Sequence, residues 1–140
     1  MATDGWIQPP LPRPLYVTSP FGYRINPVSH RPELHRGVDF RSRCGDVQRA
    51  AMSGTVWKIY SAASGFTGGN AVYMNHGMVN GSSWVTVHMH LSRVDVHVGQ
   101  KIQKGQQIGL TGTTGWSTGC HLHFELWRNG TPINAMSIIG

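Results

Sequence analysis

The sequence predicts an all-β protein, and three observations support this prediction. Glycine and proline are abundant, with 18 and 8 residues among 140, whereas the helix-forming residues Glu, Lys and Ala are scarce. Several short segments alternate apolar and polar side chains, as strands with one buried face do. Asn80-Gly81 and Asn129-Gly130 are dipeptides that favour tight hairpin turns. No segment has a convincing helical periodicity.

Strands and loops are expected to alternate along the whole chain. Strands are expected at 15–18, 38–40, 55–60, 70–76, 83–91 and 121–126, with short strands and turns over 94–109. Residues 26–37 contain Pro27, Pro32 and Gly37 and are expected to form a loop. The glycine-rich segments 61–69 and 111–119 are expected to be loops at the rim of the fold.

The chain is expected to be one domain preceded by a short arm. Its 140 residues show no break in composition and can bury a core of their own. Residues 1–14 are proline-rich and lack periodicity, which predicts an extended arm before a domain at 15–140. Residues 1–20 lack a signal-peptide pattern, and no later stretch resembles a membrane span. Three alternatives are open: a removed export signal, export by another route, or a protein that stays inside the cell.

The charge of the chain narrows the class of partner. The formal net charge is +6 and the isoelectric point is about 9.9. Six arginines lie within residues 24–49. Such a surface attracts nucleic acid, an anionic membrane, or the teichoic and carboxylate-rich polymers of a bacterial wall. Nucleic acid is the weaker option, because the chain lacks both an aromatic-basic sheet pattern and a helix suited to a DNA groove.

Two cysteines, Cys44 and Cys120, have three possible states. They are buried thiols, metal ligands or a disulfide, and the absence of C-x-x-C spacing weakens the ligand interpretation. A bridge over so long a loop stabilises the fold by about 4 kcal/mol in the chain-entropy model. We favour the disulfide, which would indicate an oxidising destination.

Residues 119–125, Gly-Cys-His-Leu-His-Phe-Glu, carry the clearest chemical signal. Alternation places His121, His123 and Glu125 on one face of a strand and apolar side chains on the other. Two imidazoles and a carboxylate on one face suit a metal ion or a proton transfer. A solvated or hydrogen-bonded histidine pair is the alternative on this stretch alone.

His35 and Asp39 form a second candidate pair, four residues apart. A helix is disfavoured there by the neighbouring Pro32 and Gly37. A fully extended strand would separate the two side chains by about 13 Å, which is too far for one ion. A bend at Gly37 would bring them together. In isolation, His35 is equally well a loop histidine and Asp39 a carboxylate at a strand edge.

Taken together, these residues suggest a catalytic metal site. His35, Asp39, His90 and one of His121 and His123 supply two or three imidazoles and a carboxylate. Two histidines, one carboxylate and a coordination position left for water are typical of catalytic zinc. Spacing alone leaves open which of the two strand histidines binds the metal.

The order of three motifs resembles a known family. His35-Arg36-Gly37-Val38-Asp39, His88-Met89-His90-Leu91 and the segment 119–125 are similar to the motifs of the lysostaphin-type, LytM-like peptidoglycan metalloendopeptidases. Further matching phrases include Ser19-Pro20-Phe21-Gly22-Tyr23-Arg24, so the resemblance covers about residues 15–135. It implies a fold of the duplicated hybrid motif type. Such a fold has an antiparallel sheet, a small barrel-like half and long glycine-rich loops that wall a groove.

The resemblance also implies roles for individual residues. It implies that His35, Asp39 and His123 bind one Zn²⁺ and that His90 and His121 are the catalytic pair. It is consistent with a Cys44–Cys120 bridge, since a similar cysteine pair occurs in some members. The side chains expected to line the substrate groove are His76, His88 and Trp116. We expect Glu125 to support the site from outside the ligand set.

The expected function is that of a zinc-dependent endopeptidase that hydrolyses amide bonds in peptidoglycan cross-bridges or stem peptides. An inactive wall-binding or regulatory domain of the same fold is the first rival, and a basic nucleic-acid-binding barrel is a weaker one. Peptidoglycan peptides and anionic wall polymers are the expected partners of a monomer that acts at the cell wall, outside the cell or in the periplasm. The compact chain, with its own Met1, resembles a phage lytic enzyme such as an endolysin. A trimmed bacterial enzyme is the alternative.

Overall fold

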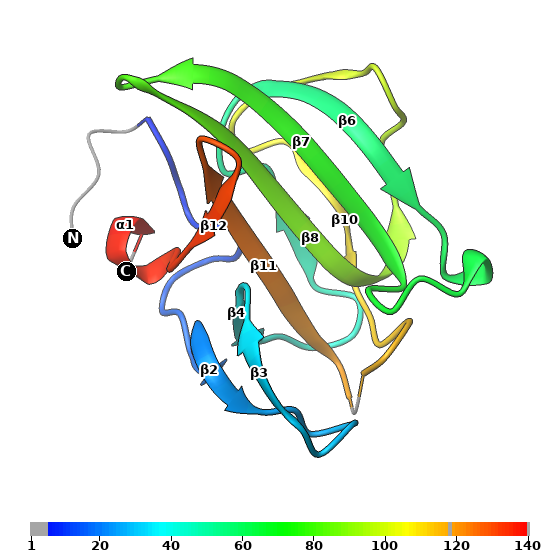
Figure 1. The fold of residues 1–140 in the computed structure, drawn as a ribbon. Helices are drawn as coiled ribbons and strands as arrows, with labels where there is room; N and C mark the ends of the chain where they lie inside the picture. The colour runs from blue at the N-terminus through cyan, green and yellow to red at the C-terminus, as the bar shows by residue number, and fades with distance from the viewer. Residues whose placement is uncertain (1–5, 118, 140) are drawn as a thin grey trace.

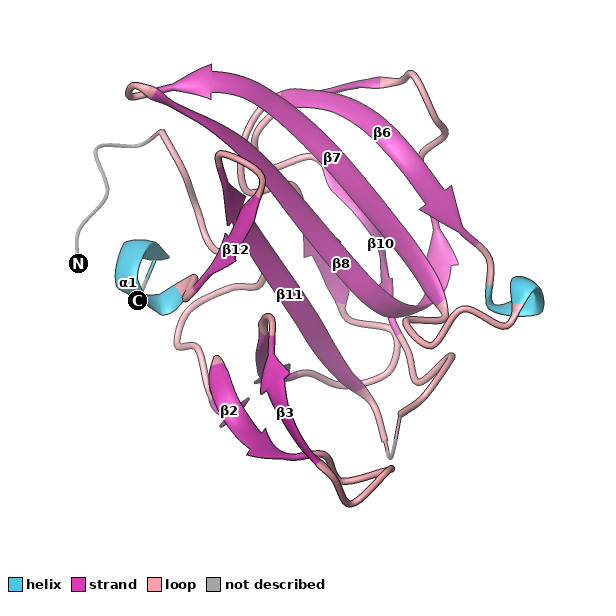
Figure 2. Cartoon of the chain, viewed as in Figure 1, coloured by secondary structure: helices cyan, strands magenta, loops and turns pink. Residues whose placement is uncertain are grey.

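The fold is built almost entirely from antiparallel strands, as the composition predicts. A computed structural model describes residues 6–117 and 119–139. Within these residues, one ten-stranded sheet and one separate two-stranded sheet account for the strands (Figure 1). Helical structure is confined to two short turns at the periphery (Figure 2). The all-β prediction is therefore confirmed.

Twelve strands and two helical turns make up the described chain. The strands are β1 (Val17–Ser19), β2 (Gly22–Ile25), β3 (Pro32–His35), β4 (Val38–Arg41), β5 (Val47–Arg49), β6 (Gly54–Tyr60), β7 (Asn70–Val79), β8 (Ser82–Val94), β9 (Lys101–Ile102), β10 (Gln107–Thr111), β11 (His121–Arg128) and β12 (Thr131–Ile133). The helical turns are η1 (Ala62–Ser64) and α1 (Met136–Ile139). In the described part of the chain, neither turn has the length or hydropathy that a bilayer-spanning helix requires.

The central strands of the large sheet bring distant parts of the sequence together. The strand order is β1-β4-β11-β8-β7-β6-β9, and β10 pairs with both β5 and β8. β11 lies between β4 and β8, so His123 is opposite Asp39 on one side and Met89 on the other. The pairing of β11 thereby places the histidine strand beside both of the other motifs.

The apolar face of β11 forms the centre of the main core. Leu122, Phe124 and Leu126 have no solvent exposure. They pack in one cluster with Val38 and Phe40 of β4. Full burial of such side chains stabilises the fold by about 1.5–3 kcal/mol each. The predicted alternation along this strand is confirmed, because the histidines occupy the opposite face.

The expectation of an unpacked arm at residues 1–14 needs correction. Residues 1–5 lie outside the described part, but Ile7 and Leu11 are buried in the main core cluster. The backbone N–H of Gln8 donates to the carbonyl of Ala51, and that of Arg49 donates to the carbonyl of Pro10. Two isolated apolar side chains therefore fix this proline-rich segment against the domain, although it forms no strand.

The loop expected at residues 26–37 is also partly wrong. Pro32–His35 forms β3, which pairs with β2 in the separate hairpin (Figure 1). Proline is tolerated there because Pro32 is the first residue of an edge strand. The hairpin exposes much of its apolar surface, including Tyr23 at 86%. Its strands were therefore not marked by a buried, alternating face.

Cys44 and Cys120 form a disulfide, with their Cα atoms 5.3 Å apart. The bridge joins the segment that follows β4 to the residue that precedes β11. It thus connects the two strands that carry the candidate ligands Asp39 and His123. The sequence-based preference for a bridge is confirmed.

Replacing both cysteines by serine is expected to lower the free energy of unfolding by about 4 kcal/mol, because the bridge closes a long loop in the unfolded chain. The sequence separation is 76 residues. Urea denaturation followed by tryptophan fluorescence measures the change. Reducing agent should shift the wild-type midpoint to the same degree and leave the double variant unaffected. An unchanged midpoint in the variant would contradict the prediction.

Candidate metal centre

A bend at Gly37 brings His35 and Asp39 together. His35 ends β3 and Asp39 lies in β4, and their atoms Nε2 and Oδ1 are 3.3 Å apart. A Cβ at residue 37 would lie 2.5 Å from the carbonyl oxygen of Phe124 and 3.0 Å from the ring of His123. Glycine is required because β11 passes so close to the bend.

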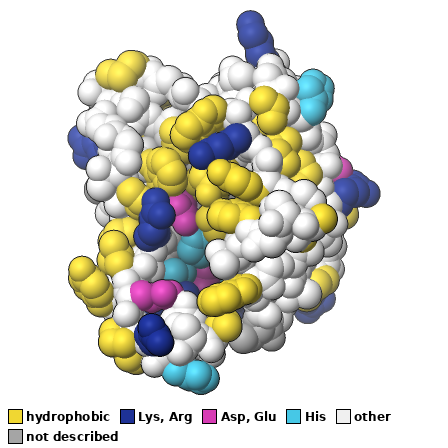
Figure 3. Space-filling model, turned by 45° about the vertical axis from the view of Figure 1, so that its right-hand side comes forward, with side chains coloured by type: hydrophobic (Ala, Val, Ile, Leu, Met, Phe, Trp, Pro, Cys, Tyr) yellow, Lys and Arg dark blue, Asp and Glu magenta, His cyan; other side chains and the backbone are white. Residues whose placement is uncertain are grey.

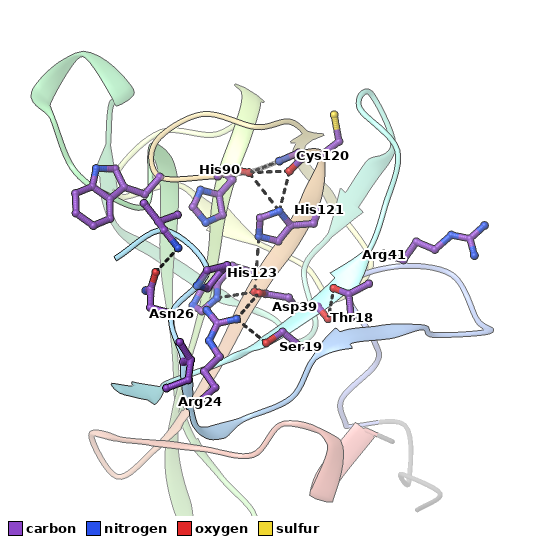
Figure 4. Close-up of a pocket in the computed structure, with 16 residues that line it drawn as sticks. Thr18, Ser19, Arg24, Asn26, Asp39, Arg41, His90, Cys120, His121 and His123 are labelled. Atoms are coloured by element: carbon purple, nitrogen blue, oxygen red, sulfur yellow. Dashed lines mark hydrogen bonds and ion pairs between the residues drawn. The ribbon is translucent and has the colours of Figure 1, made fainter. Parts of the chain in front are cut away.

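His123 completes a group of three donor atoms. Its Nδ1 lies 2.9 Å from Oδ1 of Asp39 (Figure 4). The same Nδ1 lies 3.1 Å from Nε2 of His35. The three residues are at most 9% exposed. These three side chains are also the group, among the described residues, whose spacing could hold a metal ion.

Hydrogen bonds fix which nitrogen of His35 and of His123 faces the other donor atoms. The Nδ1–H of His35 donates to the carbonyl of Pro20 at 2.9 Å, so Nε2 carries the lone pair. The Nε2–H of His123 donates to Glu125 at 2.8 Å, so Nδ1 faces the other two donors. Both rings are thereby held in the orientation that a metal ligand needs.

The donor set fits zinc. A tetrahedral zinc site with bonds of about 2.0–2.2 Å places its ligands about 3.4 Å apart. The observed separations of 2.9–3.3 Å approach this spacing. Two imidazoles and one carboxylate form an open site, because tetrahedral zinc has a fourth position for water or substrate.

The electrostatics of the three residues also favour a cation. Burial would raise the pKa of Asp39, but hydrogen bonds with His123 and His35 hold it well below its usual range. Burial would lower the pKa of His123, but its hydrogen bonds with Asp39 and Glu125 raise it to about 9. Positive charge is therefore stabilised between the carboxylates of Asp39 and Glu125.

Glu125 supports His123 from outside the donor set, as expected from the sequence. One carboxylate oxygen accepts from His123, and the other accepts from the indole N–H of Trp127 at 2.8 Å. Burial would raise the pKa of Glu125, but its interactions with His123 lower it. The carboxylate is thus ionised and held on both sides.

Replacing Glu125 by glutamine is expected to weaken metal binding by about 10–100-fold, because the partner that orients and polarises His123 loses its charge. Competition with a chromophoric chelator measures the dissociation constant. Glu33→Gln is the matched control, since it removes the same charge from an exposed position on β3. Equal affinities for the wild type and Glu125→Gln would contradict this role.

His90 reaches the centre because β8 contains a bulge. Between His88 and Leu91 the register of β8 against β7 advances by three residues while β7 advances by two. His90 has a positive φ of 63°, a conformation that is uncommon for residues other than glycine. A bulge re-aims the side chain at its position, and the ring of His90 lies 6.1 Å from that of His123.

His90 and His121 form a pair beside the three donors. Their ring centroids are 4.9 Å apart, and Nε2 of His121 lies 3.7 Å from Oδ1 of Asp39 (Figure 4). Each ring donates its Nδ1–H to a backbone carbonyl, His90 to Thr114 and His121 to Gly119. Both Nε2 atoms therefore carry a lone pair. Burial lowers the pKa of His90 to about 4, so this ring is neutral at pH 7.

Two connected cavities form a groove across this centre. One has a volume of about 570 Å³ and contains His121, and the other has about 370 Å³ and contains His35. Trp116, His90 and His123 line both. Figure 3 shows histidine side chains at the bottom of a hollow framed by hydrophobic groups.

The two glycine-rich loops contribute to the walls, as predicted. Phe66, Thr67 and Gly68 line the smaller cavity, and Trp116 from the other loop stands between the cavities. A hydrogen bond from the backbone N–H of Trp116 to the carbonyl of Thr67 ties the loops together at 2.7 Å. Trp116 is 58% exposed, so it is available to a substrate.

The structure does not bring His76 and His88 to the groove. His88 has no solvent exposure, and its Nδ1–H donates to the side chain of Gln48 at 2.7 Å. His76 is buried between the carbonyl of Ser53 and the hydroxyl of Thr86. The expectation that they wall the groove is corrected, because the strand face that carries them points into the interior.

Arg24 is a site residue that the sequence analysis did not single out. Its Nη1 lies 3.5 Å from Oδ2 of Asp39 and 2.5 Å from the hydroxyl of Ser19 (Figure 4). Its side chain also lines both cavities. The sequence signal for it was the segment 19–24, which matches the family resemblance. The spacing of Arg24 from the other candidate residues gave no separate reason to place it at the site.

Comparison with known proteins identifies the family. The model of peptidase family M23 matches residues 33–135, which include all five candidate ligand and catalytic residues. The chain belongs to peptidase family M23. An uncharacterised metalloprotease of Haemophilus influenzae is 41% identical over 96% of this chain and 27% of its own length. The DD-carboxypeptidase/endopeptidase Mpg of Neisseria meningitidis is 38% identical over 87% of this chain and 26% of its own length.

Solved structures of M23 proteins share the fold. A zinc-containing peptidase from Vibrio cholerae has a TM-score of 0.80 at 32% identity, over 93% of this chain and 39% of that one. The catalytic domain of lysostaphin from Staphylococcus simulans has a TM-score of 0.73 at 30% identity, over 88% of this chain and 90% of that one. The M23 chain thus matches a whole catalytic domain but spans about a quarter of the length of the curated relatives it matches.

Proposed function

We propose that this M23 chain is a zinc-dependent endopeptidase domain that hydrolyses amide bonds in bacterial peptidoglycan, in a cross-bridge or a stem peptide. The observation that carries the proposal is the open set of three donors with two further histidines at its side. The names of its relatives support the substrate class, since they include a DD-carboxypeptidase/endopeptidase and lysostaphin.

His35, Asp39 and His123 are the proposed ligands of one Zn²⁺. An ion bound there supplies Lewis-acid chemistry, which polarises the scissile carbonyl and makes water more acidic. The protein holds the donors in place through the carbonyl of Pro20 and the carboxylate of Glu125. The structurally similar peptidase of Vibrio cholerae contains zinc, which supports this choice of metal.

His90 and His121 are the proposed groups that move protons and stabilise charge. Water adds to the carbonyl carbon, the C–N bond breaks, and a proton from water passes to the leaving amine. The lone pair on Nε2 of either ring can accept that proton, and the resulting imidazolium can donate it. A protonated ring can also stabilise the negative charge that develops on the carbonyl oxygen.

The site of action and the partners follow from the same proposal. Relatives named as peptidoglycan enzymes support action at the wall, outside the cell or in the periplasm. The net charge of +6 would hold the protein on anionic wall polymers. A monomer from a phage or a bacterium, able to lyse walls, is consistent with these features.

Turbidity of purified cell walls is the direct test. The zinc-loaded protein should clear the suspension, a chelator should stop the clearing, and added zinc should restore it. Mass spectrometry of the released fragments identifies the bond. Wall binding without any released fragment would favour an inactive wall-binding or regulatory domain instead.

A further inference from the structure

The groove contains an arginine beside the candidate metal site, Arg24, to which the proposed mechanism assigns no function. Arg24 lies in β2, and its guanidinium contacts Oδ2 of Asp39 (Figure 4). The two histidines contact the other carboxylate oxygen, Oδ1. Its side chain is 23% exposed and borders both cavities. A substrate that crosses the centre therefore passes this guanidinium.

The hydrogen-bonding capacity of Arg24 is not exhausted by its neighbours. A guanidinium has five N–H donors, and within the described residues Nη1 meets Ser19 and Asp39. Its Nε is buried and has no acceptor among the described residues. A ligand does not reach the buried Nε, but within the described residues the terminal Nη2 has no partner either and is not among the buried atoms, so Nη2 can donate to an acceptor on a ligand.

The charge around the larger cavity favours an anionic ligand. Among the described residues that line it, Arg24 and Arg41 are basic and Asp39 is the one acid. Asp39 is already shared with His35 and His123. In this cavity two arginines thus outnumber one acid, whereas Glu33 and Glu125 line the smaller cavity. Arginine is the side chain best suited to bind an incoming carboxylate.

We propose that Arg24 binds a free carboxylate on the residue that follows the scissile amide. This inference rests on the proposed function and narrows its substrate class. The favoured amides are those whose leaving residue carries an unblocked α-carboxylate, such as a D-amino acid at a chain end or the cross-linking diamino acid of a stem peptide. Internal amides of a glycine bridge lack that group.

The spacing is compatible with this arrangement. Three bonds separate the scissile carbonyl carbon from the α-carboxylate carbon of the next residue, a span of at most about 4 Å. Arg24 lies 3.5 Å from a carboxylate oxygen of the proposed ligand Asp39. A carbonyl at the metal centre therefore places the following carboxylate within reach of the guanidinium.

Matched peptides test the proposal. The probes are a D-alanyl-D-alanine peptide that ends in a carboxylate and the same peptide ending in a carboxamide. The zinc-loaded wild type should hydrolyse the carboxylate form with a kcat/KM about 10–100-fold higher, as expected for a hydrogen bond to a charged group. Arg24→Gln should remove this preference mainly through KM, and Arg24→Lys should keep part of it.

Arg41→Gln is the matched control. It removes the same charge from the same cavity, but its guanidinium lies over the ring of Tyr16, 5.3 Å from the centroid, and points away from the centre (Figure 4). This variant should retain the carboxylate preference. Metal content is measured for every variant, because Arg24 also contacts a proposed ligand. Loss of zinc from Arg24→Gln with an intact preference would assign Arg24 to holding Asp39 and would overturn the proposal.

A binding readout separates this inference from the proposed activity. In zinc-loaded His90→Ala, whose metal ligands are intact, calorimetry should detect tighter binding of the carboxylate peptide. Equal binding of both peptides would overturn the role of Arg24 even if the wild type hydrolyses walls. If the protein does not hydrolyse peptides but still prefers the carboxylate peptide through Arg24, the carboxylate site is supported and the endopeptidase function is refuted.

Discussion

Replacing His123 by alanine is expected to remove the metal and to lower hydrolysis by about 10³-fold or more, since Lewis-acid stabilisation amounts to several kcal/mol. The loss should be this large because His123 is in contact with both other donors, at 2.9 and 3.1 Å. Asp39→Ala and His35→Ala should behave alike. Metal analysis after dialysis and the rate of wall clearing check both parts of the expectation.

The effect of zinc on thermal stability is an independent measure of metal binding by His123→Ala. Zinc at 1,000 times its dissociation constant stabilises the wild type by about 4 kcal/mol, and the Tm of His123→Ala should not respond to zinc. His97→Ala is the control, since His97 lies in an exposed turn and should keep the response. A metal-free variant that clears walls at the wild-type rate would refute the zinc mechanism.

The sequence predicted the geometry of the candidate metal site where that geometry is local. Period-two alternation is enough to place Leu122 and His123 on opposite faces of β11. The bend that joins His35 to Asp39 follows from a glycine between them. The pairing of β11 with β4 could not be predicted from residue spacing, because the two strands are far apart in the sequence. It was available only from the family resemblance or from the structure.

Other features depend on tertiary contacts that leave weak local signals. Strict alternation assigns His88 and His90 to one face, but a bulge between His88 and Leu91 changes the phase, and only His90 reaches the groove. Ile7 and Leu11 are single apolar residues in a proline-rich segment, so their burial has no periodicity to reveal it. Arg24 comes within 3.5 Å of Asp39 through the tertiary fold, and no local pattern in the sequence indicates that contact.

Replacing His90 or His121 is expected to slow the chemical step of hydrolysis without weakening metal binding. Alanine at either position is expected to lower kcat by about 10²–10⁴-fold, the range of general acid–base catalysis. The zinc content should stay that of the wild type, because neither ring belongs to the set of three close donors. Steady-state kinetics on a defined stem peptide, combined with metal analysis of the same samples, measures both quantities.

The double variant shows whether the two rings act as one unit. Their centroids are 4.9 Å apart, and each ring is held by its own backbone carbonyl, from Thr114 or Gly119. Loss of one ring therefore leaves the other in place. If one ring takes the proton and the other stabilises the oxyanion in the same transition state, the double variant should be little slower than the worse single variant. Losses that multiply would instead indicate independent roles, and zinc-replete single variants with wild-type kcat would refute the catalytic assignment.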